Sequence, residues 1–124
     1  MSRARPRGFT YPRNTEAMHS DAFTIAFVGH ARPDMAALAG AFEDAVLALL
    51  PDHGAKVMYR GRRAEGQADT LPFEVHLLEF PNQAAFASYL ADERRQALLA
   101  EYGEVFMMKQ AVAMDEIVPR SFAP

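Results

Sequence analysis

The chain has 124 residues, half of them hydrophobic, with no cysteine and a formal net charge of −3. This length fits one domain that can bury a hydrophobic core of its own. The absence of cysteine excludes disulfides, thiolate nucleophiles and thiolate metal sites. Residues 1–20 hold four arginines against one glutamate, so the rest of the chain is acidic. An acidic body argues against nucleic-acid binding, which needs a basic face.

The ends of the chain carry no pattern that predicts an anchor or a leader. The apolar runs are too short to span a bilayer, and the basic start is not followed by the apolar stretch of a signal peptide. We therefore expect a cytoplasmic protein that binds no membrane. We expect residues 1–20 to be a disordered or loosely attached basic arm, residues 21–118 to form the folded domain, and residues 119–124 to be a C-terminal tail.

Hydrophobic periodicity predicts four strands and two helices. The strands are expected over Ala22–His30, Ala55–Arg63, Pro72–Phe80 and Glu104–Val118. The helices are expected over Ala31–Leu50 and from Asn82 to Tyr102. Pro81 stops the third strand, and the side chain of Asn82 can accept from a free N–H of the second helix. An unbroken second helix would turn Glu93 inward, which predicts a break near Ala91–Glu93.

The order β-α-β-β-α-β, joined by right-handed crossovers, predicts a ferredoxin-like α+β fold. Its four-stranded antiparallel sheet should have the strand order 4-1-3-2, with both helices on one face. We expect the helices to cover Phe23, Ile25, Phe27, Val75 and Leu77. The other face would carry Ala26, Val28, Met58, Leu78 and Phe80. So apolar a face should be hidden, and packing two copies about a two-fold axis predicts a homodimer, the dimeric α+β barrel.

The fourth predicted strand, Glu104–Val118, is much longer than its predicted neighbour Ala22–His30. Its surplus end includes Met114, Glu116 and Ile117. We expect this end either to bend away from the sheet or to lie on the second subunit.

Several short motifs resemble the domain-of-unknown-function 1330 family. They are Asp52-His53-Gly54, Tyr59-Arg60-Gly61, Glu65-Gly66, the run His76–Pro81 and Gln96-Ala97-Leu98. The resemblance covers residues 34–117. It implies a fold similar to the dimeric α+β-barrel superfamily, which includes cofactor-free monooxygenases, isomerases and stress-responsive proteins, but it implies no agreed reaction. The chain departs from the family at Gly54-Ala55, where a double glycine is common, and at Arg95, where a tyrosine is common.

His76 is the leading candidate for a catalytic residue. It lies in the middle of the third predicted strand, and alternation from Val75 and Leu77 places it on the open face of the sheet. An imidazole there could act as a general base. The alternative is a histidine packed within the dimer interface. His30, at the end of the first predicted strand, shares this face and is a candidate for ligand binding; the alternative is a surface residue at the turn between the strand and the helix.

Basic side chains on the second predicted strand form a further candidate site. Lys56, Arg60 and Arg62 share one face of it and could steer an anion or stabilise an enolate, with Arg60 as the second catalytic candidate. Lysine and arginine on an edge strand also discourage further strand pairing, which is the structural alternative. Glu79 could be a base, but capping the second helix is the role its position favours.

Met58 and Phe80 are expected to line an apolar ligand site. No spacing of histidines and carboxylates predicts a metal ion, and no glycine-rich loop predicts a nucleotide or another cofactor. Three functions remain open. The protein binds a small organic acid or aromatic molecule in a cavity on the sheet, or is a cofactor-free monooxygenase or isomerase with a histidine base, or is a non-catalytic structural or regulatory homodimer.

Overall fold

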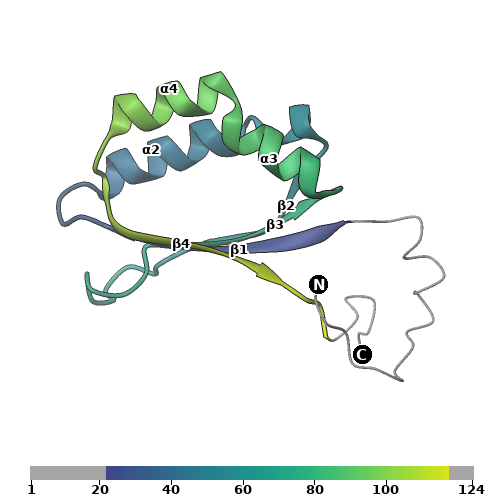
Figure 1. Ribbon diagram of the computed structural model, residues 1–124. Coiled ribbons are helices and arrows are strands. Elements are labelled where there is room, and N and C mark those ends of the chain that lie inside the picture. The colour runs from purple at the N-terminus through teal and green to yellow at the C-terminus, as the bar shows by residue number, and fades with distance from the viewer. Residues whose placement is uncertain (1–21, 118–124) are drawn as a thin grey trace.

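The computed structural model describes residues 22–117 of the chain, so the predicted arm and the whole of the predicted tail lie outside the described residues. The elements follow the predicted order, with the second helix in two pieces (Figure 1). The strands are β1 (Phe23–Ala31), β2 (Lys56–Arg62), β3 (Glu74–Phe80) and β4 (Phe106–Met114). The helices are α2 (Ala36–Leu47), the short 3₁₀ turn η1 (Leu50–His53), α3 (Gln83–Ala91) and α4 (Glu93–Tyr102).

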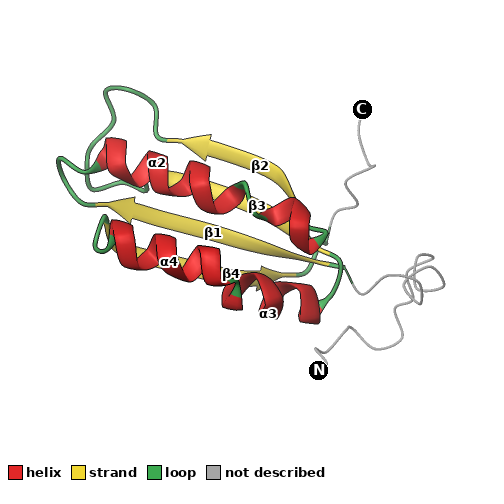
Figure 2. Cartoon of the chain, turned by 90° about the horizontal axis from the view of Figure 1, so that it is seen from above, coloured by secondary structure: helices red, strands yellow, loops and turns green. Residues whose placement is uncertain are grey.

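The four strands form one antiparallel sheet in the order β2-β3-β1-β4, which confirms the predicted arrangement. The helices lie on one face of this sheet and leave the other face uncovered, as Figure 1 shows. Seen from above in Figure 2, α2 and α4 run side by side, roughly along the direction of the strands. The chain therefore has the ferredoxin-like α+β fold that the order of elements predicted.

The ends of the helices are set by local polar groups. Asn82 caps α3 as predicted, because its side-chain oxygen accepts a hydrogen bond from the Ala85 N–H at 2.8 Å. The predicted break is also present, since Asp92 leaves the helical conformation between α3 and α4. The first helix begins later than predicted, at Ala36, because Asp34 has the left-handed φ of 70° and interrupts the backbone before it.

The register between β1 and β3 overturns one prediction about the faces of the sheet. Phe23 pairs with Phe80, Ile25 with Leu78, and Phe27 with His76. Directly opposed residues of an antiparallel pair point to the same face, so these side chains all lie under the helices. The predictions that the helices cover Val75 and Leu77, and that His76, Leu78 and Phe80 lie on the open face, were wrong.

A bulge in β2 changes which of its side chains share a face. Val57 pairs with Leu78 and Tyr59 pairs with Leu77, so Met58 is the extra residue between them. After the bulge, Arg60 pairs with His76 on the helix side, whereas Lys56 before it pairs with Glu79 on the open side. The prediction that all the basic side chains of this strand share one face was therefore wrong.

The predicted extra length of the fourth strand is also absent. β4 ends at Met114 and has nine residues, the same number as β1. Ile117 lies beyond the strand and is 80% exposed. Within the described residues, β4 is therefore no longer than β1, and no extra strand residues need a second subunit as a partner.

The uncovered face of the sheet is apolar, as predicted, although partly through different residues. It carries the side chains of the even-numbered residues of β1 and of the residues that pair with them on β3 and β4. The large apolar ones that remain exposed are Tyr59, Leu77, Met108, Val112 and Met114. We call this surface the open face. Among the helices of the described residues, none has the length and apolar character needed to cross a membrane.

Candidate functional site

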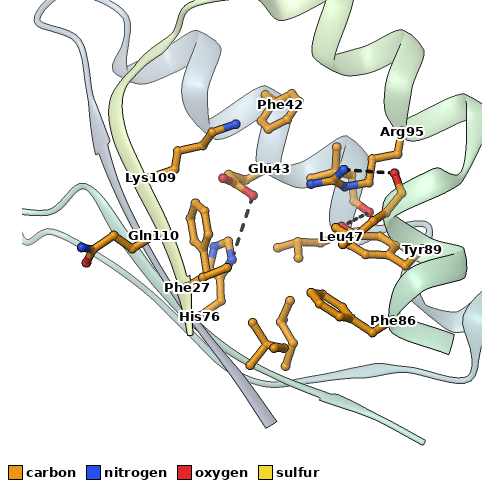
Figure 3. A pocket seen from close by; sticks show the side chains of 15 residues that line it. Phe27, Phe42, Glu43, Leu47, His76, Phe86, Tyr89, Arg95, Lys109 and Gln110 are labelled. Carbon is orange, nitrogen blue, oxygen red and sulfur yellow. Dashed lines mark hydrogen bonds and ion pairs between the residues drawn. The ribbon is translucent and has the colours of Figure 1, made fainter. Parts of the chain in front are cut away.

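A cavity of about 200 Å³ lies between the helices and the sheet (Figure 3). Most of its wall is apolar and comes from β1, α2, β3 and α3. These apolar lining residues are Ile25, Phe27, Phe42, Val46, Leu47, Leu78, Phe86 and Leu90. The polar side chains on the wall are those of Glu43, His76, Tyr89, Arg95 and Lys109. A mostly apolar concave site with a few polar groups is typical of small-molecule binding.

Glu43 is the least expected of these polar groups. It lies on α2 among buried apolar neighbours and is only 3% exposed. Its Oε2 atom is buried and has no hydrogen-bond partner. Burial raises the pKa of Glu43 to about 7, although attraction to His76 acts in the opposite direction. The side chain can therefore gain or lose a proton close to neutral pH.

His76 lies beside Glu43 and is held in place from two sides. Its ring stacks on Phe27 with the centroids 4.8 Å apart. Its Nε2 atom is 2.6 Å from Oε1 of Glu74, and its Nδ1 atom is 4.0 Å from Oε1 of Glu43. The imidazole thus bridges a buried carboxylate on its own strand and the cavity carboxyl on α2.

Glu74 fixes the proton on this imidazole. Burial raises the pKa of Glu74, but hydrogen bonds from His76, Arg60 and Arg62 outweigh that effect and lower the pKa to about 2. An ionised carboxylate only accepts hydrogen bonds, so Nε2 of His76 carries a hydrogen and donates it. The lone pair of a neutral ring then lies on Nδ1, the atom that faces Glu43.

Two arginines from β2 hold Glu74 ionised. Arg60 donates from Nε to Oε1 at 2.9 Å and from Nη2 to Oε2 at 3.0 Å, and its Nη1 is 2.9 Å from Asp44. Arg62 donates to the same carboxylate from Nε at 2.7 Å and from Nη2. Because the charge of Arg60 is used in this way, the expectation that it stabilises an enolate does not fit its position.

The other predicted site residues are not brought together. Lys56 lies on the open face with its Nζ atom 3.6 Å from Oε1 of Glu79, and the register places Glu79 on this face too, away from the helix side where capping was expected. His30 is also on the open face, and Met58 is the half-exposed bulge residue. Phe80 is fully buried in the core under the helices. Of the predicted candidates, His76 alone lines the described cavity.

Sequence reasoning missed Glu43, Glu74 and Arg95 as site residues. A usable signal exists for Glu43, because it stands three residues after Gly40 and four before Leu47, both of which are buried on the same side of α2. A carboxylate at that spacing within an apolar stripe is unusual and points to a functional or paired group. No sequence signal marks Glu74, because its importance depends on the strand register.

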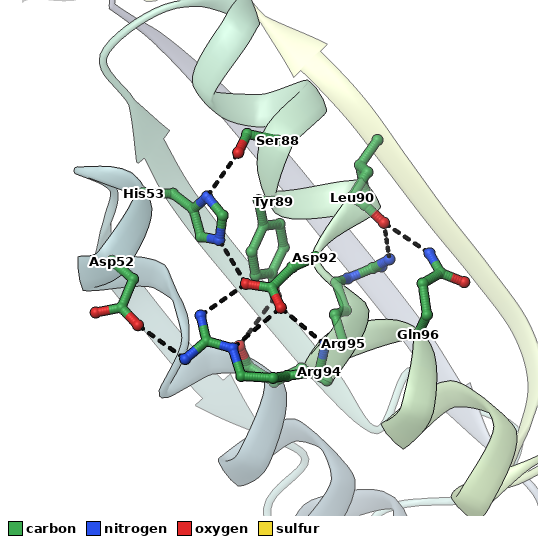
Figure 4. Close-up of polar contacts among 10 residues, drawn as sticks. Asp52, His53, Ser88, Tyr89, Leu90, Asp92, Arg94, Arg95 and Gln96 are labelled. Atoms are coloured by element: carbon green, nitrogen blue, oxygen red, sulfur yellow. Dashed lines mark hydrogen bonds and ion pairs between the residues drawn. The ribbon is translucent and has the colours of Figure 1, made fainter.

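A second polar cluster surrounds the break between α3 and α4 (Figure 4). His53 of η1 lies with Nδ1 3.1 Å from Ser88 Oγ and with Nε2 2.8 Å from Asp92 Oδ2. These contacts have the order of a Ser-His-Asp triad. However, both oxygens of Asp92 also accept from Arg94, and Ser88 lies on the exposed helix surface. The cluster fastens η1 to the two helices, and we assign it a structural role.

Comparison with known proteins supports the fold. Neither a protein-family model nor a curated protein matches this chain. A protein of unknown function from Rhodopseudomonas palustris is 15% identical, with a TM-score of 0.62 over 90% of this chain and 97% of that one. An antibiotic biosynthesis monooxygenase is 14% identical, with a TM-score of 0.59 over 78% of this chain and 99% of that one. SnoaB, a cofactor-independent oxygenase from Streptomyces nogalater, is 10% identical, with a TM-score of 0.61 over 82% of this chain and 98% of that one. At these identities the likeness establishes a shared α+β fold.

Proposed function

We propose that the protein binds a small, largely apolar molecule in the cavity and removes a proton from it, with the pair Glu43 and His76 as the acid-base group. The observation that carries this proposal is the buried, unpaired Oε2 atom of Glu43 on the wall of an aromatic cavity. A core without a function would not keep such a group, because an unsatisfied buried carboxyl is costly.

The pair has the properties of a general base at neutral pH. The carboxyl of Glu43 has a pKa of about 7, and proton transfer is most effective when the pKa of the base lies near the working pH. His76 presents Nδ1 toward it and is oriented from behind by Glu74. The imidazole therefore lies where a positive charge on it stabilises the ionised form of Glu43. This moves the first proton acceptor from His76, the candidate named from sequence, to its neighbour.

Two reaction classes begin with such a proton abstraction. In an isomerase, the base takes a proton from an activated C–H bond, the electron pair forms an enolate, and the proton is returned at another carbon. In a cofactor-free monooxygenase acting on a CH₂ group, the carbanion forms a C–O bond with O₂ and the peroxide takes up the abstracted proton. Loss of the second C–H proton then forms C=O as the O–O bond breaks, and the second oxygen leaves as water. The shared fold with SnoaB and with the monooxygenase supports the second class as a candidate for this chain.

The purely structural alternative is less well supported by the interior. A non-catalytic dimer would fill its cavity with its own side chains, and flexible methionines are well suited to that role. None of the described residues that line the cavity is a methionine. The exposed methionines of β4 that the structure describes are Met107, Met108 and Met114.

We further propose that two copies of the chain associate through the open face, as in a dimeric α+β barrel, and that the chain is a divergent relative of the domain-of-unknown-function 1330 family. The support for association is physical. The open face carries five large exposed apolar side chains from β2, β3 and β4, and so large an apolar patch is uncommon on a monomer in water. A two-fold arrangement would cover it with an identical face.

Proton abstraction can be tested without knowing the substrate. The probe is 2-indanone, a small aromatic ketone with acidic C–H groups, and the readout is deuterium uptake from D₂O followed by NMR. We expect catalysed exchange whose rate rises as the pH passes through about 7, since the ionised form of Glu43 is the base. Glu43→Gln should lower the catalysed rate by at least about a hundredfold, the lower end of the usual range for a general base.

The matched control is Glu79→Gln, which changes a carboxylate on the open face and should leave exchange unchanged. His76→Gln should lower the rate and alter its pH profile. Exchange that persists at the wild-type rate in Glu43→Gln would rule out this carboxylate as the base. If the wild-type protein binds 2-indanone but catalyses no exchange, the protein binds a ligand in the cavity without acting as a base.

A further inference from the structure

Arg95 differs from the other arginines of the described chain in its partners. Each of the others has a carboxylate within 4.0 Å, and these are Arg32, Arg60, Arg62, Arg63 and Arg94. Within residues 22–117, no such ion pair includes Arg95. Its Nε atom is buried and has no hydrogen-bond partner. A guanidinium keeps its charge at any ordinary pH, so part of a cation lies unbalanced inside the fold.

The arginine is nevertheless held in a defined position on the cavity wall. Its guanidinium lies over the ring of Tyr89, with Cζ 5.1 Å from the centroid, and Nη1 donates to the carbonyl of Leu90 at 3.4 Å. Tyr89 is anchored in turn, since its hydroxyl donates to the carbonyl of Val46 at 3.2 Å. These contacts leave the charge without a counter-ion but fix the direction of the side chain.

Arg95 and the acid-base pair occupy different parts of the cavity. Figure 3 shows Arg95 with Tyr89 on one side and His76 with Glu43 on the other. Lys109 belongs to the Glu43 side, where its charge lowers the pKa of that carboxyl and its Nζ lies 6.0 Å from the ring centre of Phe42. The cation at the far side is therefore available to a ligand.

We infer that the ligand is a small aromatic or enol-forming carboxylate, whose anionic group is bound by Arg95 while its reactive C–H faces Glu43. This inference rests on the proposed function and names its substrate class. A carboxylate satisfies the unpaired donor and supplies the missing counter-charge, because two parallel N–H donors of arginine match its two oxygens. The apolar walls between the two ends then accommodate an aromatic ring or a planar carbon skeleton.

The test compares benzoate with benzamide, a neutral molecule of nearly the same shape, by titration calorimetry at pH 7.5. We expect the wild-type protein to bind benzoate at least about tenfold more tightly, the ratio that about 1.4 kcal/mol of charge-assisted hydrogen bonding produces. Arg95→Met should bring the two affinities within about twofold of each other, and Arg95→Lys should keep part of the preference. Melting temperatures of all variants establish that they are folded.

Two control variants locate the effect. Arg32→Met removes a surface arginine paired with Glu104, and Lys109→Met removes the cation at the other side of the cavity. The benzoate preference should survive both changes. If it survives Arg95→Met or disappears with Lys109→Met alone, the assignment to Arg95 is overturned. Equal wild-type binding of both probes refutes the carboxylate class but leaves the cavity as a binding site, whereas binding of neither refutes the proposed function as well.

Discussion

A buried carboxyl group with one unpaired oxygen makes the stability of the domain depend on pH. The pKa of Glu43 is about 7 in the folded chain against an ordinary value of 4.5. Below pH 4.5 the group is protonated in both the folded and the unfolded state. As the pH rises from 4.5 to 7, the unfolded state loses this proton first, so the free energy of unfolding falls. Glu74 has the opposite effect, because its pKa is lowered to about 2, and it acts mainly below pH 4.5, where the unfolded state takes up a proton first.

Glu43→Gln should therefore stabilise the protein more at pH 8 than at pH 5. A raised pKa of this size corresponds to a cost of about 3 kcal/mol for ionising the buried group, which sets the upper limit of the gain at pH 8. Urea unfolding of both proteins at the two pH values measures it. Glu101→Gln, at an exposed position of α4, is the matched control and should shift neither value. Equal effects of Glu43→Gln at both pH values would contradict a raised pKa.

Elements were easier to predict from sequence than the side chains they bury. Pro81-Asn82 and the break before Glu93 are local signals, because caps and helix breaks depend on a few neighbouring residues. The face of a helix depends on where the helix starts. In α2 the apolar Leu38 is 52% exposed, whereas the charged Glu43 is buried.

The cap of α3 gives a prediction at this scale. Asn82→Ala removes the side-chain oxygen that accepts from the Ala85 N–H, and it should lower the free energy of unfolding by about 1 kcal/mol. Asn82→Ser keeps a capping oxygen and should lose much less. Chemical denaturation of the two variants beside the wild type measures the difference. An alanine variant as stable as the serine variant would show that packing, and not the cap, fixes the start of this helix.

At the scale of the whole molecule, the strand order was predictable but the register was not. Four strands in a βαββαβ chain have few allowed arrangements, so the order of elements was enough to predict the sheet. In β3 both alternating sets of residues, Val75 with Leu77 and His76 with Leu78, contain apolar side chains. Local alternation cannot choose between such sets, and only pairing with β1 decides which one lies under the helices. The bulge at Met58 also cannot be recognised from the alternation within β2 alone. Arg60 was therefore expected to face a ligand, whereas in the structure it binds Glu74.

The open face carries the last prediction. Leu77 lies on the central strand β3 opposite Ala26 and Tyr59, and it is 37% exposed in a single chain. If two copies pack through this face, Leu77→Lys places a charge in a desolvated interface and should weaken the dimer by at least about tenfold, a typical cost of more than 1 kcal/mol at a buried interface position. Leu38→Lys makes the same exchange on α2, on the other side of the molecule, and should leave association unchanged. Sedimentation velocity across a range of concentrations compares the two variants with the wild type, and far-UV circular dichroism of the same samples shows whether the subunit is still folded. A wild-type protein that sediments as a monomer, or a Leu77→Lys variant that associates as tightly as Leu38→Lys, would mean that the open face is not the interface.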